Sequence, residues 1–406
     1  MNWEDTPAET AFREEVRAFI GAEFPADYRR DENAEHSLEP EDVWGYNWPL
    51  DRVSDDPARR DGAQAWAAAL AARGWITPHW PAEYGGAGLD TLREFVLQEE
   101  MMRARVPTVN GIGAFLLGPT LLEHGTTEQQ AEHLPRIARG ECTWAQGFSE
   151  PESGSDLASL RTRAVLDGDR YVVNGQKVWT SLGQYADWLF VLVRTDPNVR
   201  KHKGITFLLV DTTTPGVTVR PITDIRGDTP FAEVFFDDAR IPLANRVGAE
   251  NEGWYIAMTA LSFERAGIGA TVKFEHALST LVTYLRGGGG RGDLGPLRHE
   301  IAKRYAEIRV LYNLARYTVS KQAVGGVPGY EASVNQLFGA ELHQRLAQTG
   351  AAAMGADAEL WQRDGAPLGA AFTHLRFDSV AATFLGGTTE IQRNVIATRG
   401  LGLPRS

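Results

Sequence analysis

The segment from residue 143 to about residue 248 constrains the fold most, because its residue pattern differs from that of the chain on either side. Short runs of β-branched and aromatic residues follow one another there, and Pro, Gly and Asp residues separate them as turns separate strands. The clearest runs lie at 187–193, 205–210, 217–222 and 233–236. This pattern predicts an antiparallel β-barrel or sandwich and is not typical of a parallel nucleotide-binding sheet.

Helical periodicity precedes this segment, because apolar residues recur there at the spacing of one helix face. The helices are predicted at 8–24, 58–73 and 92–105. Thr127 and Gln130 are predicted to form a capping box for a further helix, which is expected to end near Pro135. Residues 31–57 are acidic and contain prolines, which indicates a long surface excursion.

Helical periodicity also follows the strand-rich segment, in stretches long enough for a four-helix bundle. These helices are predicted at 252–286, 296–324, 330–354 and 378–399. The expected fold class is therefore multidomain α+β. We place an N-terminal helical domain at 1–142, a central β-barrel or sandwich at 143–248 and a C-terminal four-helix bundle at 249–406.

The composition excludes several classes of protein. The chain has 406 residues with 53 acidic and 41 basic side chains, and its net charge of −12 argues against a nucleic-acid partner. Cys142 is the only cysteine, so internal disulfides and thiolate zinc sites are excluded. No run approaches the ~20 apolar residues of a membrane span. The acidic start is unlike a signal peptide, and we expect a cytoplasmic protein without structural metal.

The loop GFSEPESGSD, at residues 147–156, follows an apolar run and is rich in small hydroxyl residues. Such a loop presents backbone N–H groups and hydroxyls to an anion or to the edge of a heterocycle. Its first three residues resemble the start of a nucleophile elbow, but Pro151 stands where the second glycine of that motif belongs. The loop therefore favours binding over nucleophilic catalysis.

Two β-hairpins are predicted after this loop. In the first, residues 160–166 pair with 170–173 across Asp167-Gly168-Asp169. In the second, Asn174-Gly175 turns the chain into residues 176–181, since Asn-Gly is a strong hairpin signal. The second hairpin ends in Trp179-Thr180-Ser181, which places an aromatic side chain beside two hydroxyls.

Two sequences from this region resemble the flavin-binding motifs of the acyl-CoA dehydrogenase family: GFSEPESGSDLASLRTRA and GQKVWTSLGQYADW. The resemblance continues in order through 235–237, 261–265 and the tail GGTTEIQRNVIATRGLGLPR, and it covers most of the chain after about residue 75. It implies FAD as cofactor and α,β-dehydrogenation of an acyl-CoA substrate to the 2-enoyl-CoA. It also implies tetrameric assembly and an electron-transfer flavoprotein as partner.

The resemblance implies that Glu264 is the catalytic base. Most members carry the glutamate near the C-terminus, at the position that Gly386 occupies here, whereas a subset has glycine there and the glutamate at the position matching Glu264. Without the resemblance, Glu264 beside Arg265 would be interpreted as an ion pair. Glu390 is the rival carboxylate, at a family position that faces the cofactor. A desolvated carboxylate is a stronger base because burial raises its pKa.

The remaining site residues are carried over from matching motif positions. Ser149 is implied to hydrogen-bond the flavin ring, Trp179 to lie against it and Ser181 to reach N5, the hydride acceptor. Ser155 is implied to contact the cofactor pyrophosphate or CoA. The backbone N–H of Gly386 is implied to stabilise the thioester oxygen. The other implied contacts are Phe148, Thr180, Thr388 and Glu390 for the cofactor, and Arg265 and Gly387 for CoA. The competing interpretations are a core aromatic for Trp179 and turn chemistry for the serines.

The chain departs from the family where the adenine end of FAD is held. The family has Arg-x-x-Phe-Gly and Gln-x-x-Gly-Gly motifs there, but this chain reads GRGDLGPLRHE and TGAAAMGADAE. Either other residues hold the adenine or a different chain supplies them, so a homotetramer, which we favour, and a mixed tetramer with a sister subunit both stay open.

The sequence also leaves alternatives for the function itself. They are an acyl-CoA oxidase, a flavin monooxygenase on the same scaffold, and a non-catalytic subunit of a heteromeric dehydrogenase. The placement of the base suggests an acyl group that is long, branched, dicarboxylic or sterol-derived.

Overall fold

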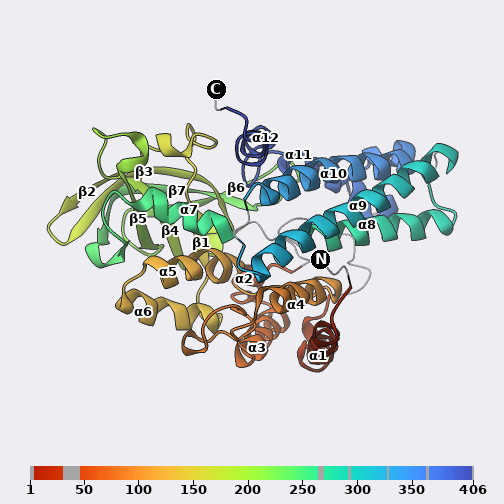
Figure 1. Ribbon diagram of the computed structural model, residues 1–406, viewed down its shortest axis with the longest axis horizontal. Helices are drawn as coiled ribbons and strands as arrows, with labels where there is room; N and C mark the ends of the chain where they lie inside the picture. Colours follow the sequence, from red (N-terminus) through yellow and green to blue (C-terminus); the bar gives the residue numbers. More distant parts are fainter. Residues whose placement is uncertain are drawn as a thin grey trace. The chain divides into compact units, whose positions relative to one another are not determined.

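A computed structural model describes residues 4–30, 46–263, 269–290, 294–326, 329–362 and 365–404 (Figure 1). The chain forms two compact units. The helical unit comprises Met1–Asn47, Asp90–Pro107 and Arg265–Ser406, and the sheet unit comprises Trp48–Leu89 and Thr108–Glu264. Each unit combines segments from before and after residue 142, where the first domain boundary is predicted from the sequence. The three predicted domains, 1–142, 143–248 and 249–406, stay predictions.

Within the described residues, the sheet unit contains one sheet of eight strands. The strands lie in the order β6-β7-β3-β2-β4-β5-β8, and β1 pairs with β4. Most neighbours are antiparallel, but β1 runs parallel to β4, and β2 meets β4 in parallel at Arg163 and Arg194. The strands are Trp144–Gly147 (β1), Arg163–Asp167 (β2), Arg170–Ser181 (β3), Trp188–Arg194 (β4), Ile205–Asp211 (β5), Val217–Ile222 (β6), Phe231–Pro242 (β7) and Arg246–Val247 (β8). All four runs that the sequence identified as strands are confirmed.

The strands β4 and β5 form the most buried part of the sheet, because their side chains are apolar on both faces and are covered on both. Edge strand β6 has no buried side chain. Helix α7 (Gly253–Phe263) packs against β5. It begins at Gly253, where a Cβ would lie 2.5 Å from the carbonyl carbon of Thr206, so only glycine allows this approach.

Strand β3 confirms the first predicted hairpin and shows that the second is wrong. Ala164 of β2 pairs with Val173 of β3, as expected. The chain then continues without a turn through Asn174-Gly175, because β3 pairs with β7 along most of its length. Gly175 lies at a shift in the β3–β7 register with φ +146°, and a Cβ there would lie 2.6 Å from Thr162 Oγ1.

The helices of the sheet unit include α6, whose start the sequence placed one residue too late. The capping box is formed by Thr126 and Gln129, and Gln129 also donates to the carbonyl of Ala244 at 2.7 Å. The sequence TTEQQ contains two overlapping matches to the motif. Pro135 does not end the helix but lies inside it. The other helices of this unit are α2 (Trp48–Asp51), α3 (Pro57–Ala72) and α5 (Gly118–His124), and α6 spans Thr127–Ala138.

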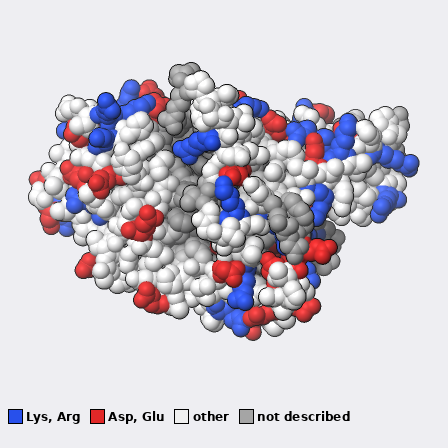
Figure 2. All heavy atoms as spheres, in the orientation of Figure 1, with Lys and Arg blue, Asp and Glu red and all other residues white. Residues whose placement is uncertain are grey.

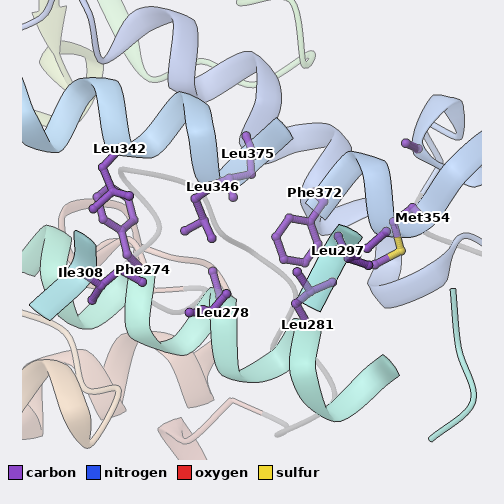
Figure 3. Close-up of a cluster of buried hydrophobic side chains, with 14 of the residues drawn as sticks. Phe274, Leu278, Leu281, Leu297, Ile308, Leu342, Leu346, Met354, Phe372 and Leu375 are labelled. Carbon is purple, nitrogen blue, oxygen red and sulfur yellow. The ribbon is translucent and has the colours of Figure 1, made fainter. Parts of the chain in front are cut away.

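The helical unit contains a four-helix bundle, as predicted, together with α1 and α4. The bundle helices are α8 (Gly269–Arg286), α9 (Leu294–Ala323), α10 (Glu331–Met354) and α11 (Ala371–Ala381); the others are α1 (Pro7–Glu23), α4 (Thr91–Arg103) and α12 (Thr389–Val395). Side chains from all four bundle helices meet in one core cluster, which includes Phe274, Ile308, Leu346 and Phe372 (Figure 3). The bundle is therefore held by a continuous apolar core.

Two of the helices predicted for the C-terminal part are wrong in extent. The stretch predicted at 252–286 corresponds to α7 of the sheet unit and α8 of the bundle. The stretch predicted at 378–399 is divided between α11 and α12 by a loop that contains Gly386 and Gly387, both with positive φ. The helices predicted at 8–24, 58–73 and 92–105 are confirmed as α1, α3 and α4.

Buried ion pairs connect α1, α4 and α9. Glu99 and Glu100 of α4 are only 2% and 3% exposed, and Arg13 of α1 contacts both carboxylates, at 3.1 Å and 2.5 Å. Tyr312 of α9 donates to Glu99 at 3.4 Å. These buried carboxylates already have basic partners, so we assign them to packing within the helical unit.

The surface carries mixed charge. On the face shown in Figure 2, Lys and Arg side chains alternate with Asp and Glu side chains, so the negative charge is not gathered in one patch. Among the described helices, none is both long and apolar enough to cross a bilayer.

Candidate active site

The loop after β1 forms a tight turn in the sheet unit. Glu150 and Ser153 exchange two backbone hydrogen bonds of 3.1 and 3.0 Å. Phe148 is buried, Ser149 is half-buried and Ser155 is exposed. The hydroxyls of Ser149 and Ser155 make no hydrogen bond within the described part of the chain. Turn chemistry therefore does not account for these two hydroxyls, and both are open to solvent or to a ligand.

The loop is joined to β3 by backbone and side-chain contacts. The N–H of Val178 donates to the carbonyl of Ser149 at 2.9 Å. The side chain of Lys177 is 0% exposed, and its Nζ donates to the Phe148 carbonyl at 3.2 Å and to Glu150 Oε1 at 2.7 Å. The two sequence motifs are thus in direct contact, with Ser149 bonded to the residue that precedes Trp179.

The Lys177–Glu150 pair is ionic despite its burial. Desolvation by burial lowers the pKa of Lys177 to about 8, and the charge of Glu150 acts in the opposite direction. Burial alone would raise the pKa of Glu150, but the charge of Lys177 and the hydrogen bonds it receives outweigh this, so its pKa is below the ordinary value. At neutral pH both side chains are therefore charged.

Trp179 stands in a bulge at the end of β3. The register with β7 shifts between Lys177 and Thr180, and Trp179 takes the left-handed conformation with φ +60°. Its side chain is 57% exposed, and its ring meets Phe231 edge to face at 6.0 Å. A left-handed conformation costs a non-glycine residue about 1–3 kcal/mol and is concentrated at functional sites. Trp179 is not a core aromatic.

A buried hydroxyl without a partner lies next to this tryptophan. Thr180 is fully buried, and its Oγ1 has no hydrogen-bond partner among the described residues. This atom is enclosed by the protein, so it is not itself open to a ligand. Ser181 is half-buried and pairs with Phe231 across the strands. The exposed ring of Trp179, with the hydroxyls of Ser149 and Ser181 on the adjoining segments, fits a planar heteroaromatic group with polar edges, as a flavin has.

A separate group of predicted site residues, in the helical unit, lies in the glycine loop before α12. Gly386 and Gly387 have φ +62° and +94°, and Gln392 Nε2 donates to their carbonyls at 3.0 and 3.3 Å. The N–H of Gly386 donates to no acceptor in the residues that the structure describes. Thr388 caps α12 by accepting the N–H of Ile391 at 3.2 Å. The loop therefore presents a free backbone donor at a defined place.

Glu390 lies in the first turn of α12 and is exposed. Its own backbone N–H, with the hydroxyls of Thr389 and Thr388 and nearby Arg393, holds the pKa of its carboxyl below the usual value. This favours the anion and opposes a role as the base. The two remaining predicted residues, Glu264 and Arg265, lie outside the described residues, directly after the end of α7.

Sequence reasoning did not assign roles to Lys177 and Glu150. A signal was present in the sequence, because Lys177 alternates with the apolar Tyr171 and Val173, and a lysine on that inward face requires a buried partner. The sequence could not identify that partner, since the loop and β3 are separated by 27 residues at this contact.

Comparison with known proteins agrees with this arrangement. Family models for the N-terminal, middle and C-terminal domains of acyl-CoA dehydrogenase match residues 51–141, 145–239 and 251–401. The acyl-CoA dehydrogenase IpdE1 of Mycobacterium tuberculosis is 42% identical over 84% of this chain and 88% of its own length.

Two solved structures superimpose along the whole chain. The ChsE4-ChsE5 complex from Mycobacterium tuberculosis has a TM-score of 0.82 and 32% identity, covering 100% of both chains. The Tcur3481-Tcur3483 steroid ACAD has a TM-score of 0.83 and 30% identity, also covering 100% of both.

The three matched domains and the 42% identical relative identify the class of protein as a flavin-dependent dehydrogenase, and the exposed tryptophan beside a hydroxyl-rich loop is consistent with it. The chain belongs to the acyl-CoA dehydrogenase family. As a member of this family, it is an enzyme of acyl-CoA dehydrogenation with FAD as its cofactor.

Proposed function

We propose that this chain converts an acyl-CoA to its 2-enoyl-CoA, with Glu264 as the base that removes the α-proton. The supporting observation is the left-handed conformation of Gly386, the position where most of the family carries the glutamate. A side chain at φ +62° is strained, so this loop disfavours a glutamate there and leaves Glu264 as the base.

The chain's own residues divide the remaining work. Ser149 hydrogen-bonds the flavin ring, Ser181 reaches N5, and Trp179 lies against the ring, with Phe148 and Thr180 as the adjoining cofactor contacts. Thr388 and Glu390 contact the cofactor from the bundle, Ser155 contacts its pyrophosphate or CoA, and Arg265 and Gly387 hold CoA. The free N–H of Gly386 stabilises the charge that develops on the thioester oxygen. When bound, FAD supplies the hydride acceptor at N5.

The substrate class we propose is an acyl-CoA with a bulky, steroid-related acyl group. The support is the steroid ACAD at 30% identity over the full length of both chains, together with the helix-borne base of the family subset. A panel of straight, branched, dicarboxylic and steroid side-chain acyl-CoA thioesters, assayed by anaerobic flavin bleaching, tests this. Bleaching fastest with a straight medium chain would contradict the steroid class, and no bleaching with any thioester would contradict the reaction.

We propose a multimeric cytoplasmic enzyme that passes its electrons to an electron-transfer flavoprotein. Two structural relatives are complexes of two different chains, which favours the mixed tetramer more than the sequence alone does. Sedimentation of the chain with FAD separates the cases. An active flavin-loaded homotetramer would contradict a required sister subunit, and an apo dimer that takes up FAD only with a partner would support one. Peroxide formation during turnover in air would instead indicate an oxidase.

A further inference from the structure

The buried ion pair between Lys177 and Glu150 connects three segments of the sheet unit. Lys177 Nζ bonds the loop at Glu150 Oε1 (2.7 Å) and at the Phe148 carbonyl (3.2 Å). Glu150 in turn accepts the backbone N–H groups of Arg161 at 2.6 Å and Thr162 at 2.9 Å, just before β2. One carboxylate thereby fixes the loop, the start of β2 and β3 relative to one another.

Stability alone does not explain this pair. The Lys177 side chain is 0% exposed and that of Glu150 is 8% exposed, and desolvating two charges costs about as much as their attraction returns. Replacing a buried ion pair by uncharged residues is often neutral or stabilising, and the N–H groups of Arg161 and Thr162 need only an acceptor at position 150, which an uncharged amide also supplies. The pair does fix positions, because the buried ammonium and carboxylate must keep all their partners at once: the Phe148 carbonyl for Lys177 and the N–H groups of Arg161 and Thr162 for Glu150.

The place that the pair fixes is the proposed flavin-binding face. Lys177 is the last residue of β3 in register with β7 before the bulge that turns Trp179 outward. The next residue, Val178, donates its N–H to the Ser149 carbonyl. Movement of the loop against β3 would therefore change the separation of Ser149 and Trp179.

We propose that Lys177 and Glu150 are positioning residues that set the flavin site by holding Ser149 and Trp179 in fixed relation. This inference deepens the proposed function and rests on its assignment of these two residues to the flavin. It assigns no contact between the pair and the flavin; the pair acts through the loop and the bulge.

The test replaces both members together, Lys177→Met with Glu150→Gln, so that neither charge is left buried without its partner. The matched control is Lys201→Met with Asp156→Asn, which removes an exposed ion pair of 2.6 Å between Asp156, at the end of the same loop, and Lys201. For both variants we measure the melting temperature of the apoprotein, the Kd for FAD, and the visible absorption spectrum of the bound flavin.

We expect the Lys177/Glu150 double variant to melt within a few degrees of the parent, to bind FAD about tenfold more weakly or worse, and to show shifted flavin absorption bands. The control should match the parent in all three measurements. A parental Kd with a parental spectrum would overturn the proposal. A double variant that does not fold would also overturn it, because the pair would then serve the fold and not the site.

These readouts do not depend on the substrate. A parent protein that binds FAD but is bleached by no acyl-CoA would refute the proposed reaction and leave the positioning role standing. A parent that is bleached by acyl-CoA, with a double variant of parental Kd and spectrum, would refute the positioning role alone.

Discussion

Helix α10 packs against α11 at Gly350 with no room for a side chain. A Cβ at this position would lie 1.9 Å from Cδ1 of Phe372 and 2.4 Å from its Cε1. Phe372 is 2% exposed within the core cluster (Figure 3), so the ring has no solvent into which it can move. Since carbon atoms pack at about 3.5 Å or more, Gly350→Ala requires a displacement of roughly 1.6 Å in the ring or a helix.

The expected change in stability is the difference of two effects. Alanine is favoured over glycine in a helix interior by about 1 kcal/mol, and overpacking a filled core costs about 1–3 kcal/mol. The short contact places Gly350→Ala at the upper end of that cost, so we expect a net loss of about 2 kcal/mol. Gly339→Ala in the same helix is the matched control, since its Cβ would meet Leu311 at an ordinary 3.7 Å. It should gain up to about 1 kcal/mol.

The free energy of unfolding of both variants is measured by chemical denaturation followed by far-UV circular dichroism. The denaturation midpoints are comparable when the slope of the free energy against denaturant concentration is the same for both. Combining Gly350→Ala with Phe372→Leu should recover part of the loss, with a coupling energy of about 0.5–3 kcal/mol, because the smaller side chain leaves room for the new methyl group. If Gly350→Ala proves as stable as Gly339→Ala, the close α10–α11 packing is refuted.

Three further predictions concern chemistry and pH. Glu264→Gln should retain flavin and lose about 10²–10⁴ in the rate of bleaching by substrate; bleaching at the parental rate would show that Glu264 is not the base. Trp179→Ala should weaken FAD binding or shift its spectrum with little change in melting temperature, whereas a lower melting temperature with unchanged flavin would indicate a packing role. Burial lowers the pKa of His343 from 6.5 to about 4, so the stability that its neutral form contributes is present above pH 6.5 and is lost as the pH falls towards 4. The parent should lose up to about 3 kcal/mol more than His343→Gln across that range, and equal losses in denaturation at pH 6.5 and 4.5 would contradict the assignment.

The elements that the sequence located correctly are those whose signals lie within the element. Strand β5 is a run of apolar residues ended by an aspartate, and helix α1 has a cap, a proline and an apolar face of its own. The error at α6 has the same origin. Thr126 and Thr127 satisfy the capping pattern equally well, and the contacts that distinguish them lie outside the motif: Gln129 bonds the Ala244 carbonyl, while Gln130 is held by Tyr84 and the Leu121 carbonyl.

The features that escaped prediction depend on partners distant in the sequence. Asn174-Gly175 has the local preference of a turn, but the pairing of β3 with β7 outweighs it. Strict alternation would place Trp179 on the same inward face as Lys177. The bulge between them reverses the alternation, so Thr180 takes the inward position and Trp179 becomes exposed. No local pattern indicates that reversal, although it creates the proposed flavin-binding surface.

The same distinction applies to the proposed base. The sequence shows that glycine stands at position 386, where most of the family has glutamate, and that a glutamate stands at position 264. It does not show why the loss of the first glutamate accompanies the presence of the second. The glycine loop supplies a physical reason. Its left-handed backbone and the two carbonyls bonded by Gln392 suit residues without side chains. A glutamate restored at position 386 would strain that loop and change the direction of the N–H that we assign to the thioester oxygen. Moving the base to position 264 leaves the loop free to act only as a donor, so the two functions are carried by separate residues.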